Sequence, residues 1–67
     1  MKMMGIIKWY KKDKKYGYII GADDEEYFFN NVNCVNPEED FNEGDKVLFI
    51  PEFVTMEYAT KVEKVTE

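Results

Sequence analysis

The sequence predicts an all-β fold in which five short strands form a small barrel or sandwich. Short runs of β-forming residues recur along the chain, and charged or Gly/Pro-containing turns separate them. No segment has the length and apolar spacing of an amphipathic helix. With 67 residues, the chain is expected to form one domain over residues 1–67. A barrel is favoured because closure removes the exposed strand edges that a short all-β chain otherwise has to protect.

The first two strands are predicted over residues 4–10 and 16–20, which are rich in isoleucine and aromatic residues. The five residues between them are all charged and are expected to form a turn. Because alternate side chains of a strand share a face, Tyr16 and Tyr18 lie on one side and the core aliphatics on the other. The two tyrosines are therefore expected on the outer surface. Gly17, between them, predicts a close backbone approach or a bulge.

The third strand is predicted over residues 27–30 and contains three consecutive aromatic residues. Three neighbouring side chains cannot all face the core, because their directions alternate along a strand. If Tyr27 and Phe29 face the core, then Phe28 and Asn30 face outward. This assignment provides one more ring for the surface that carries the two outward tyrosines of the second strand.

The second half of the chain supplies two further strands. Residues 31–40 have the composition of a loop, which a single helical turn could begin. The fourth strand is predicted over residues 46–50, and Pro51 then marks a strand end, an edge or a bulge because proline cannot donate a ladder hydrogen bond. The last strand is predicted over residues 57–65, which include the small residue Ala59.

Positive charge is concentrated at the start of the chain, although the net charge is −5. Residues 1–20 carry six lysines and one acid, whereas residues 21–67 carry three lysines and thirteen acids. A local field steers a ligand more effectively than the overall sum does. The basic segment is compatible either with a polyanionic partner or with a solvated strand and loop that keep the protein soluble.

Composition also excludes several classes of protein. The single cysteine, Cys34, cannot form an internal disulfide, and with no histidine a structural zinc site is not expected. No apolar run approaches the roughly 20 residues that cross a membrane, and no signal peptide is recognisable. We therefore expect a cytoplasmic, monomeric protein with no membrane contact, no metal and no small-molecule cofactor.

Lysines and aromatic rings are interleaved in residues 8–19, where five lysines and four rings occupy twelve positions. Lysines neutralise phosphates, and rings stack on bases, so this segment is typical of a single-strand nucleic-acid binder. In a meander of the first three strands, several rings would share one outer face with lysines at its rim. The alternative is that the rings are simply core. The residues of the expected surface are Trp9, Tyr16, Tyr18 and Phe28, with Lys8 and Lys14 near the rim.

The ordered set of motifs in this chain resembles the cold-shock domain family over essentially its whole length. The family motifs G-x-V-K-W-F, K-G-F-G-F-I, V-F-V-H-F, E-G-x-x-V-x-F and A-x-x-V are similar to residues 5–10, 14–19, 27–30 and 43–49 and to the pair Ala59 and Val62, with the third motif degraded. The resemblance implies a five-stranded antiparallel barrel of the oligonucleotide/oligosaccharide-binding (OB) type. It also implies binding of single-stranded RNA or DNA, with RNA-chaperone or antitermination roles.

Carried over position by position, the resemblance implies nucleic-acid binding by Lys8, Trp9, Tyr10, Lys14, Tyr16, Tyr18, Phe28 and Asn30, with Tyr10 the weaker match. Several departures from the family pattern bear on affinity. Lys15 stands where the family has glycine, Asn30 replaces a histidine, and Asn31 and Glu38 stand where the family offers further aromatic residues. Each lost stacking platform removes roughly 1–3 kcal/mol of binding free energy. We therefore expect a weaker or shorter-site binder than a typical family member.

Three classes of function are distinguished by these residues. The leading interpretation is sequence-tolerant binding of single strands by stacking and lysine–phosphate contacts. The alternative is an OB-type barrel whose surface serves a protein partner, for which the acidic half of the chain is the evidence. An enzyme is not expected, because general acid–base catalysis needs a positioned group with a tuned pKa. Cys34 has no partner base, and the acidic residues 23–26 read as a solvated turn.

Overall fold

The structure, a computed structural model, describes residues 1–53 and 56–65 and confirms the predicted all-β class. The predicted helical turn at the start of the long loop is also present, as the short 3-10 helix η1. In chain order the elements are β1 (Met3–Lys11), β2 (Tyr16–Gly21), β3 (Glu26–Asn30), η1 (Asn31–Asn33), β4 (Lys46–Phe53) and β5 (Glu57–Lys64).

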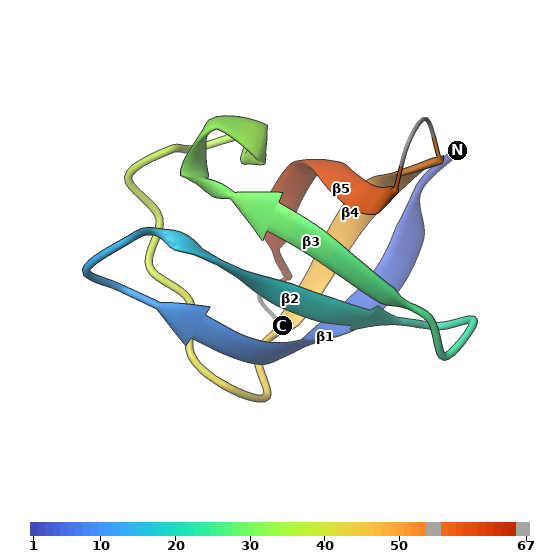
Figure 1. Ribbon diagram of the computed structural model, residues 1–67, viewed down its shortest axis with the longest axis horizontal. Helices are drawn as coiled ribbons and strands as arrows, with labels where there is room; N and C mark the ends of the chain where they lie inside the picture. The colour runs from blue at the N-terminus through green and yellow to red at the C-terminus, as the bar shows by residue number, and fades with distance from the viewer. Residues whose placement is uncertain (54–55, 66–67) are drawn as a thin grey trace.

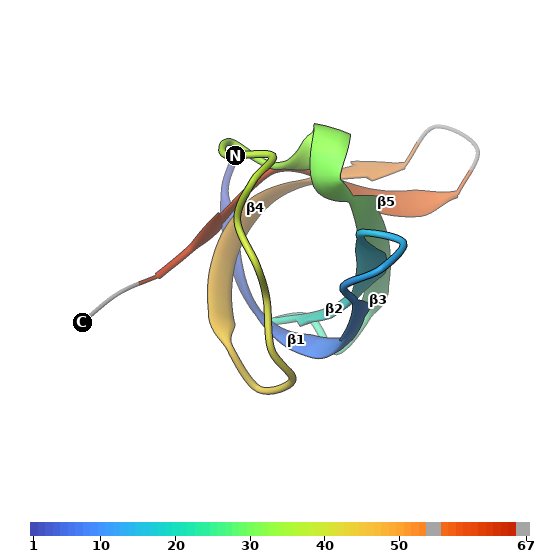
Figure 2. The same ribbon diagram turned by 90° about the vertical axis from the view of Figure 1, so that its left-hand side faces the viewer.

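The five strands close into a barrel in the order β1-β2-β3-β5-β4, which confirms the predicted barrel of the OB type (Figures 1 and 2). The β1–β2, β2–β3, β4–β5 and β1–β4 pairs are antiparallel, whereas β3 and β5 are parallel. The barrel is thus mixed, and the fully antiparallel arrangement implied by the resemblance is corrected at this one pair. A long connection that includes β4 separates β3 from β5, and such connections, unlike tight hairpins, allow parallel pairing.

Aromatic rings fill much of the barrel interior. Tyr27 and Phe29 of β3 are both fully buried, while Phe28 and Asn30 are half-buried on the other face, so the predicted alternation of β3 is confirmed. The buried hydrophobic residues are Ile7, Ile19, Tyr27, Phe29, Cys34, Phe41, Val47, Phe49, Ala59 and Val62. Their burial, worth about 1.5–3 kcal/mol for each large side chain, is the main term that holds this small domain together.

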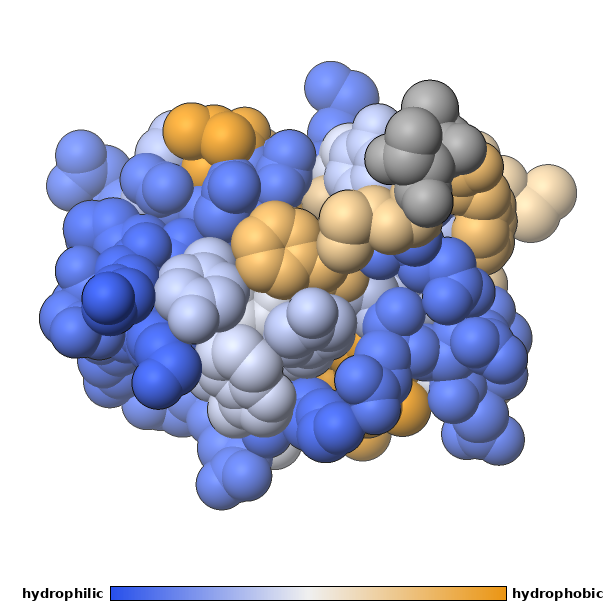
Figure 3. All heavy atoms as spheres, viewed as in Figure 1, coloured by the Kyte–Doolittle hydropathy of each residue, from blue (hydrophilic) through white to orange (hydrophobic). Residues whose placement is uncertain are grey.

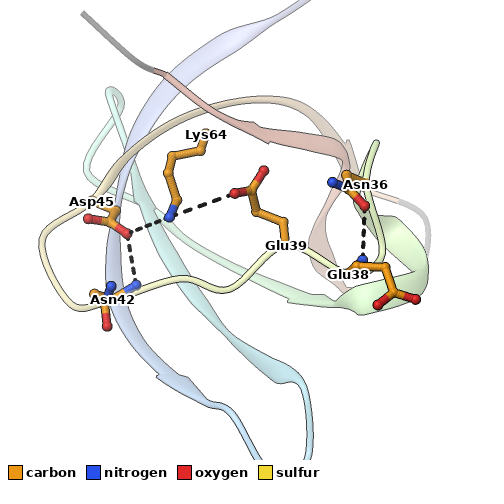
Figure 4. Close-up of polar contacts among 6 residues, drawn as sticks. All are labelled: Asn36, Glu38, Glu39, Asn42, Asp45 and Lys64. Carbon is orange, nitrogen blue, oxygen red and sulfur yellow. Dashed lines mark hydrogen bonds and ion pairs between the residues drawn. The ribbon is translucent and has the colours of Figure 1, made fainter.

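The segment between η1 and β4 crosses one end of the barrel, as Figure 2 shows. It inserts Phe41, which is fully buried, and Lys64 of β5 lies 5.7 Å from the centre of that ring. Lys64 also lies 3.8 Å from Glu39 and 3.5 Å from Asp45, on either side of it (Figure 4). A lysine held between two carboxylates and a ring thus fixes this segment against the last strand.

Pro51 lies inside β4, so the predicted end of the fourth strand at residue 50 is wrong. Pro51 pairs with Ala59 of β5, whereas the β1–β4 ladder reaches only as far as Phe49. Around Pro51, β4 therefore has one neighbouring strand and a free side, which is the edge position where strands tolerate proline. The edge position, one of the three alternatives for Pro51, is the one that the structure has.

Candidate functional site

Four aromatic side chains that the sequence places on one surface touch one another on the outer side of β1, β2 and β3. The ring centre of Trp9 lies 5.2 Å from that of Tyr18 and 5.6 Å from that of Tyr16. Phe28 lies 5.6 Å from Tyr18 and 5.8 Å from Tyr16, so the four contacts form a closed circuit, called here the ring cluster. The rings meet at angles between 43° and 81°, the tilted and edge-to-face geometry that aromatic pairs prefer.

Strand register explains why the ring cluster exists. Trp9 of β1 is the direct partner of Tyr18 of β2, and Tyr18 is in turn the partner of Phe28 of β3. Neighbouring strands lie about 4.8 Å apart, so direct partners on one face are forced into contact. Tyr16 lies two residues away on β2, where it pairs with Asn30. All four rings are half-buried, which leaves part of each ring open to a ligand.

A β-bulge at Lys8 puts Trp9 on the outer face. Ile7 pairs with Ile19, but the next pair is Trp9 with Tyr18, so one residue of β1 has no direct partner. Strict alternation from the buried Ile7 would have turned Trp9 inward. The extra residue shifts the phase by one position and brings Trp9 to the side of Tyr18.

Tyr10 lies on the other side of β1 and does not join the ring cluster. Its ring stacks on Phe29 with centres 5.6 Å apart and meets the edge of Phe41 at 5.3 Å. Burial raises the pKa of the Tyr10 hydroxyl above its usual value. Tyr10 pairs with Gly17, where a Cβ atom would overlap the Trp9 carbonyl oxygen. The predicted close approach at Gly17 is therefore confirmed, and Tyr10 contributes to packing at the barrel end.

The β1–β2 turn, residues 11–15 and called here the basic hairpin, carries four exposed lysines beside the ring cluster. The Lys11 carbonyl accepts hydrogen bonds from the N–H groups of Lys14 at 3.2 Å and Lys15 at 2.6 Å. The Lys15 carbonyl accepts the Asn31 N–H at 2.9 Å, which ties the hairpin to η1. These backbone hydrogen bonds already order the turn. Its lysine side chains can therefore contact phosphates without the entropic cost of ordering the turn on binding.

Lys8, the remaining lysine of the predicted site, is engaged by an acid. Its Nζ atom lies 2.7 Å from a carboxylate oxygen of Glu26, and both side chains are about half exposed. An exposed ion pair of this kind contributes little to stability, because water and salt screen it. The ammonium group of Lys8 is thus already paired with a carboxylate in this structure.

The β2–β3 turn, which lies at the opposite end of β2 from the basic hairpin, is acidic. Tyr27 donates a hydrogen bond of 2.7 Å to Asp23, and this bond lowers the pKa of the Asp23 carboxyl group. Partial burial, together with Glu25 and Asp23, raises the pKa of Glu57 on β5 above its usual value. The ring cluster therefore lies between a basic hairpin at one end of the barrel and a group of carboxylates at the other.

This arrangement is visible on the surface of the molecule. In Figure 3, pale and orange side chains gather in the middle of the face formed by β1, β2 and β3. Strongly hydrophilic side chains cover the left side, over the basic hairpin, and the right side, over the β2–β3 turn (compare Figure 1). The exposed rings therefore form one patch with charged borders.

Asn30 and Asn31 mark the point where β3 ends. The Asn30 side chain accepts the Val32 N–H at 3.1 Å, and the Asn33 side chain accepts the Asn30 N–H at 3.1 Å, which together cap η1. Asn31 lies in η1 beside the basic hairpin. The side-chain oxygen of Asn30 is thus committed to the turn, and its amide N–H₂ group is what remains for a ligand.

The other two positions singled out in the sequence lie in the long loop. Glu38 is exposed, and its N–H group donates to the Asn36 side chain at 3.1 Å (Figure 4). Cys34 is buried and donates to the Asn30 carbonyl at 3.6 Å. Burial, with a smaller contribution from Glu39, raises the pKa of Cys34 to about 11, so its thiol is protonated at neutral pH.

Residues 1–53 and 56–65 contain neither a candidate metal cluster nor a helix that could span a membrane. In this part of the chain, no group of three or more acidic, cysteine or histidine side chains is arranged to hold a metal ion. Within the same residues, no helix is long and apolar enough to cross a membrane.

One aromatic residue beside the ring cluster was missed by the sequence interpretation. Tyr58 of β5 is the direct partner of Phe28 across the parallel β3–β5 pair. The pairing joins two residues that are 30 positions apart along the chain, and no local pattern reports such a contact. The only available signal was the position of Tyr58 directly before Ala59, which the alternation of the last strand would have turned outward.

Neither a scan against protein-family models nor a search of the curated proteins finds a match to this chain. The geometry of the ring cluster and the basic hairpin, together with the motif resemblance, therefore indicates the function.

Proposed function

We propose that this chain binds single-stranded RNA or DNA in a sequence-tolerant manner. The observation that carries the proposal is the ring cluster, in which Trp9, Tyr16, Tyr18 and Phe28 form one exposed patch beside the basic hairpin. Every base has an apolar face, so a patch of rings accepts bases of any sequence by stacking. Lysines at one border neutralise the phosphates that connect those bases.

The fold and the motifs give independent support. OB-type barrels present strands two and three, with adjoining loops, as a surface for oligonucleotides. Because one fold serves many functions, this support is an analogy and carries less weight than the site. The resemblance to cold-shock domains favours the same ligand and extends the proposal to a cytoplasmic RNA chaperone or a cold-shock-type regulator.

The residues divide the work of binding between them. Trp9, Tyr18 and Phe28 stack bases across three strands, and Tyr16 adds a platform on the side of the basic hairpin. Lys14 and its neighbours contact phosphates, whereas Lys8 becomes available once Glu26 releases it. The acidic end of the β2–β3 hairpin repels phosphates, so the phosphate contacts are concentrated at the basic end.

The experiment that tests this function compares single-stranded with double-stranded oligonucleotides of the same pyrimidine-rich sequence. Fluorescence anisotropy of the labelled oligonucleotide should rise with protein for the single strand and much less for the duplex, because paired bases are not free to stack. Equal binding of both forms would indicate charge attraction alone. No binding of either form at low salt would contradict the proposal.

A second candidate is an OB-type barrel that binds a protein through the same surface. The Lys8–Glu26 ion pair and the carboxylates around Asp23 favour it, because they neutralise or oppose a polyanion at one side of the rings. If this surface binds a protein instead, the ring cluster should not bind oligonucleotides. The single-strand experiment therefore separates the two candidates.

A further inference from the structure

Tyr58 continues the row of rings onto a fourth strand. β5 pairs with β3 so that Tyr58 lies opposite Phe28, and Ala59, the next residue of β5, is fully buried. Because side chains alternate along a strand, Tyr58 faces outward on the same side as Phe28. Successive direct partners on β1, β2, β3 and β5 are thus Trp9, Tyr18, Phe28 and Tyr58.

The row has a definite length and a definite end. With neighbouring strands about 4.8 Å apart, four partners in a row span about 14 Å, one strand spacing more than the ring cluster alone. Tyr58 is half-buried, so part of its side chain is exposed, and within residues 1–53 and 56–65 its ring makes no ring–ring contact, including with its strand partner Phe28. On its other side Tyr58 pairs with Glu52 of β4, where a carboxylate replaces the next ring.

We propose that a single strand bound on the ring cluster continues onto β5, where Tyr58 stacks on one further base. This inference rests on the proposed function and names the path of the ligand, which crosses β1, β2, β3 and β5 in that order. The added platform offsets part of the loss expected from Asn31 and Glu38. A site assigned from the first three strands alone would end at Phe28.

The contribution of Tyr58 differs in kind from that of the basic hairpin. Glu57 precedes Tyr58 in the chain and Glu52 pairs with it, so the surroundings of this ring disfavour phosphate contacts. Tyr58 therefore acts on the base alone. Its loss should weaken binding without changing the salt dependence, whereas loss of a hairpin lysine should change both.

The test measures affinity for oligothymidylates of increasing length with three proteins: wild type, Tyr58→Phe and Tyr58→Ala. The alanine variant should bind the longest oligonucleotides about tenfold more weakly, the usual effect of losing one stacking platform. It should bind the shortest ones as the wild type does, because they end before reaching β5. The phenylalanine variant keeps the ring and should stay within about twofold of wild type.

Two further measurements keep the outcome decisive. Phe28→Ala serves as the reference for the proposed function: if the wild type binds single strands and Phe28→Ala weakens binding while Tyr58→Ala does not at any length, the path onto β5 is wrong and the function stands. If the alanine variant does not fold, ring-proton shifts of Tyr58 in the wild type replace it. An upfield shift with long but not short oligonucleotides supports the inference, and no shift with a bound long strand overturns it.

Discussion

Lys15 combines an unfavourable backbone with a charge that the proposed binding uses. Its φ of 59° lies in the left-handed region, which costs a non-glycine residue roughly 1–2 kcal/mol. Lys15→Gly should therefore raise the free energy of unfolding by about 1 kcal/mol, measured by urea denaturation, while slightly weakening oligonucleotide binding. Lys14→Gly is the matched control, because Lys14 is not among the described residues with positive φ and should gain no stability. A loss of stability in Lys15→Gly would contradict this explanation.

Glu26 acts as an internal competitor for Lys8 if the basic groups meet phosphates. Glu26→Gln removes the carboxylate that lies 2.7 Å from Lys8, so single-strand affinity should rise by about two- to fivefold, the range set by the free energy of an exposed ion pair. Glu25→Gln makes the same change of charge one residue away and should have a smaller effect. Equal gains in both variants would show that only the overall charge matters, and a loss in Glu26→Gln would exclude Lys8 from the contact.

In strand β3, the neighbouring residues Phe28 and Phe29 have different roles, one on the outer face and one in the core. Phe29 is fully buried, so Phe29→Ala should lower the free energy of unfolding by about 3–5 kcal/mol. Phe28 is half-buried in the ring cluster, so Phe28→Ala should cost less stability but about 1–3 kcal/mol of binding free energy. Thermal unfolding and oligonucleotide titration of both variants check the pair. The reverse pattern would mean that the register of β3 is wrong by one residue.

The strands were predictable because their patterns are local. Alternation in residues 16–20 and 27–30 correctly separates inward from outward side chains, and Gly17 correctly indicates a close approach. The bulge at Lys8 is different, since alternation alone would bury Trp9. The outward ring was expected from the meander of the first three strands and from the motif resemblance, and neither of them indicates the bulge. The same phase shift turns Tyr10 toward the core, which explains why it lies apart from the other predicted binding residues.

The sequence predicted that the strands form a barrel, but it did not predict which strands pair to close it. The β3–β5 contact joins distant parts of the chain in parallel, and side-chain patterns within either strand do not report the partner. Tyr58 was missed for this reason. The Lys8–Glu26 ion pair was missed for a similar reason, because it depends on where the bulged strand β1 lies relative to the start of β3.

For the molecule as a whole, charge separation sets how binding depends on salt. The chain carries a net charge of −5, yet its lysines are concentrated in residues 1–20. A plot of log affinity against log salt should be linear, with a slope of about −0.7 for each phosphate neutralised. Lys14→Gln should flatten the slope by up to one such unit, whereas Lys2→Gln should not, because Lys2 pairs with Glu63 outside the proposed site. A slope of zero would contradict phosphate contacts altogether.

Trp9 reports most directly on the central claim that the ring cluster binds single strands by stacking. It is the only tryptophan and lies half-buried among Tyr16 and Tyr18, so its emission should be that of a partly solvated indole. Adding a short pyrimidine-rich single strand at low salt should quench this emission as a base covers the ring, and rising salt should reverse the effect. A matched duplex should quench it much less. Emission that is unchanged by any single strand at high micromolar concentration would contradict nucleic-acid binding by this surface.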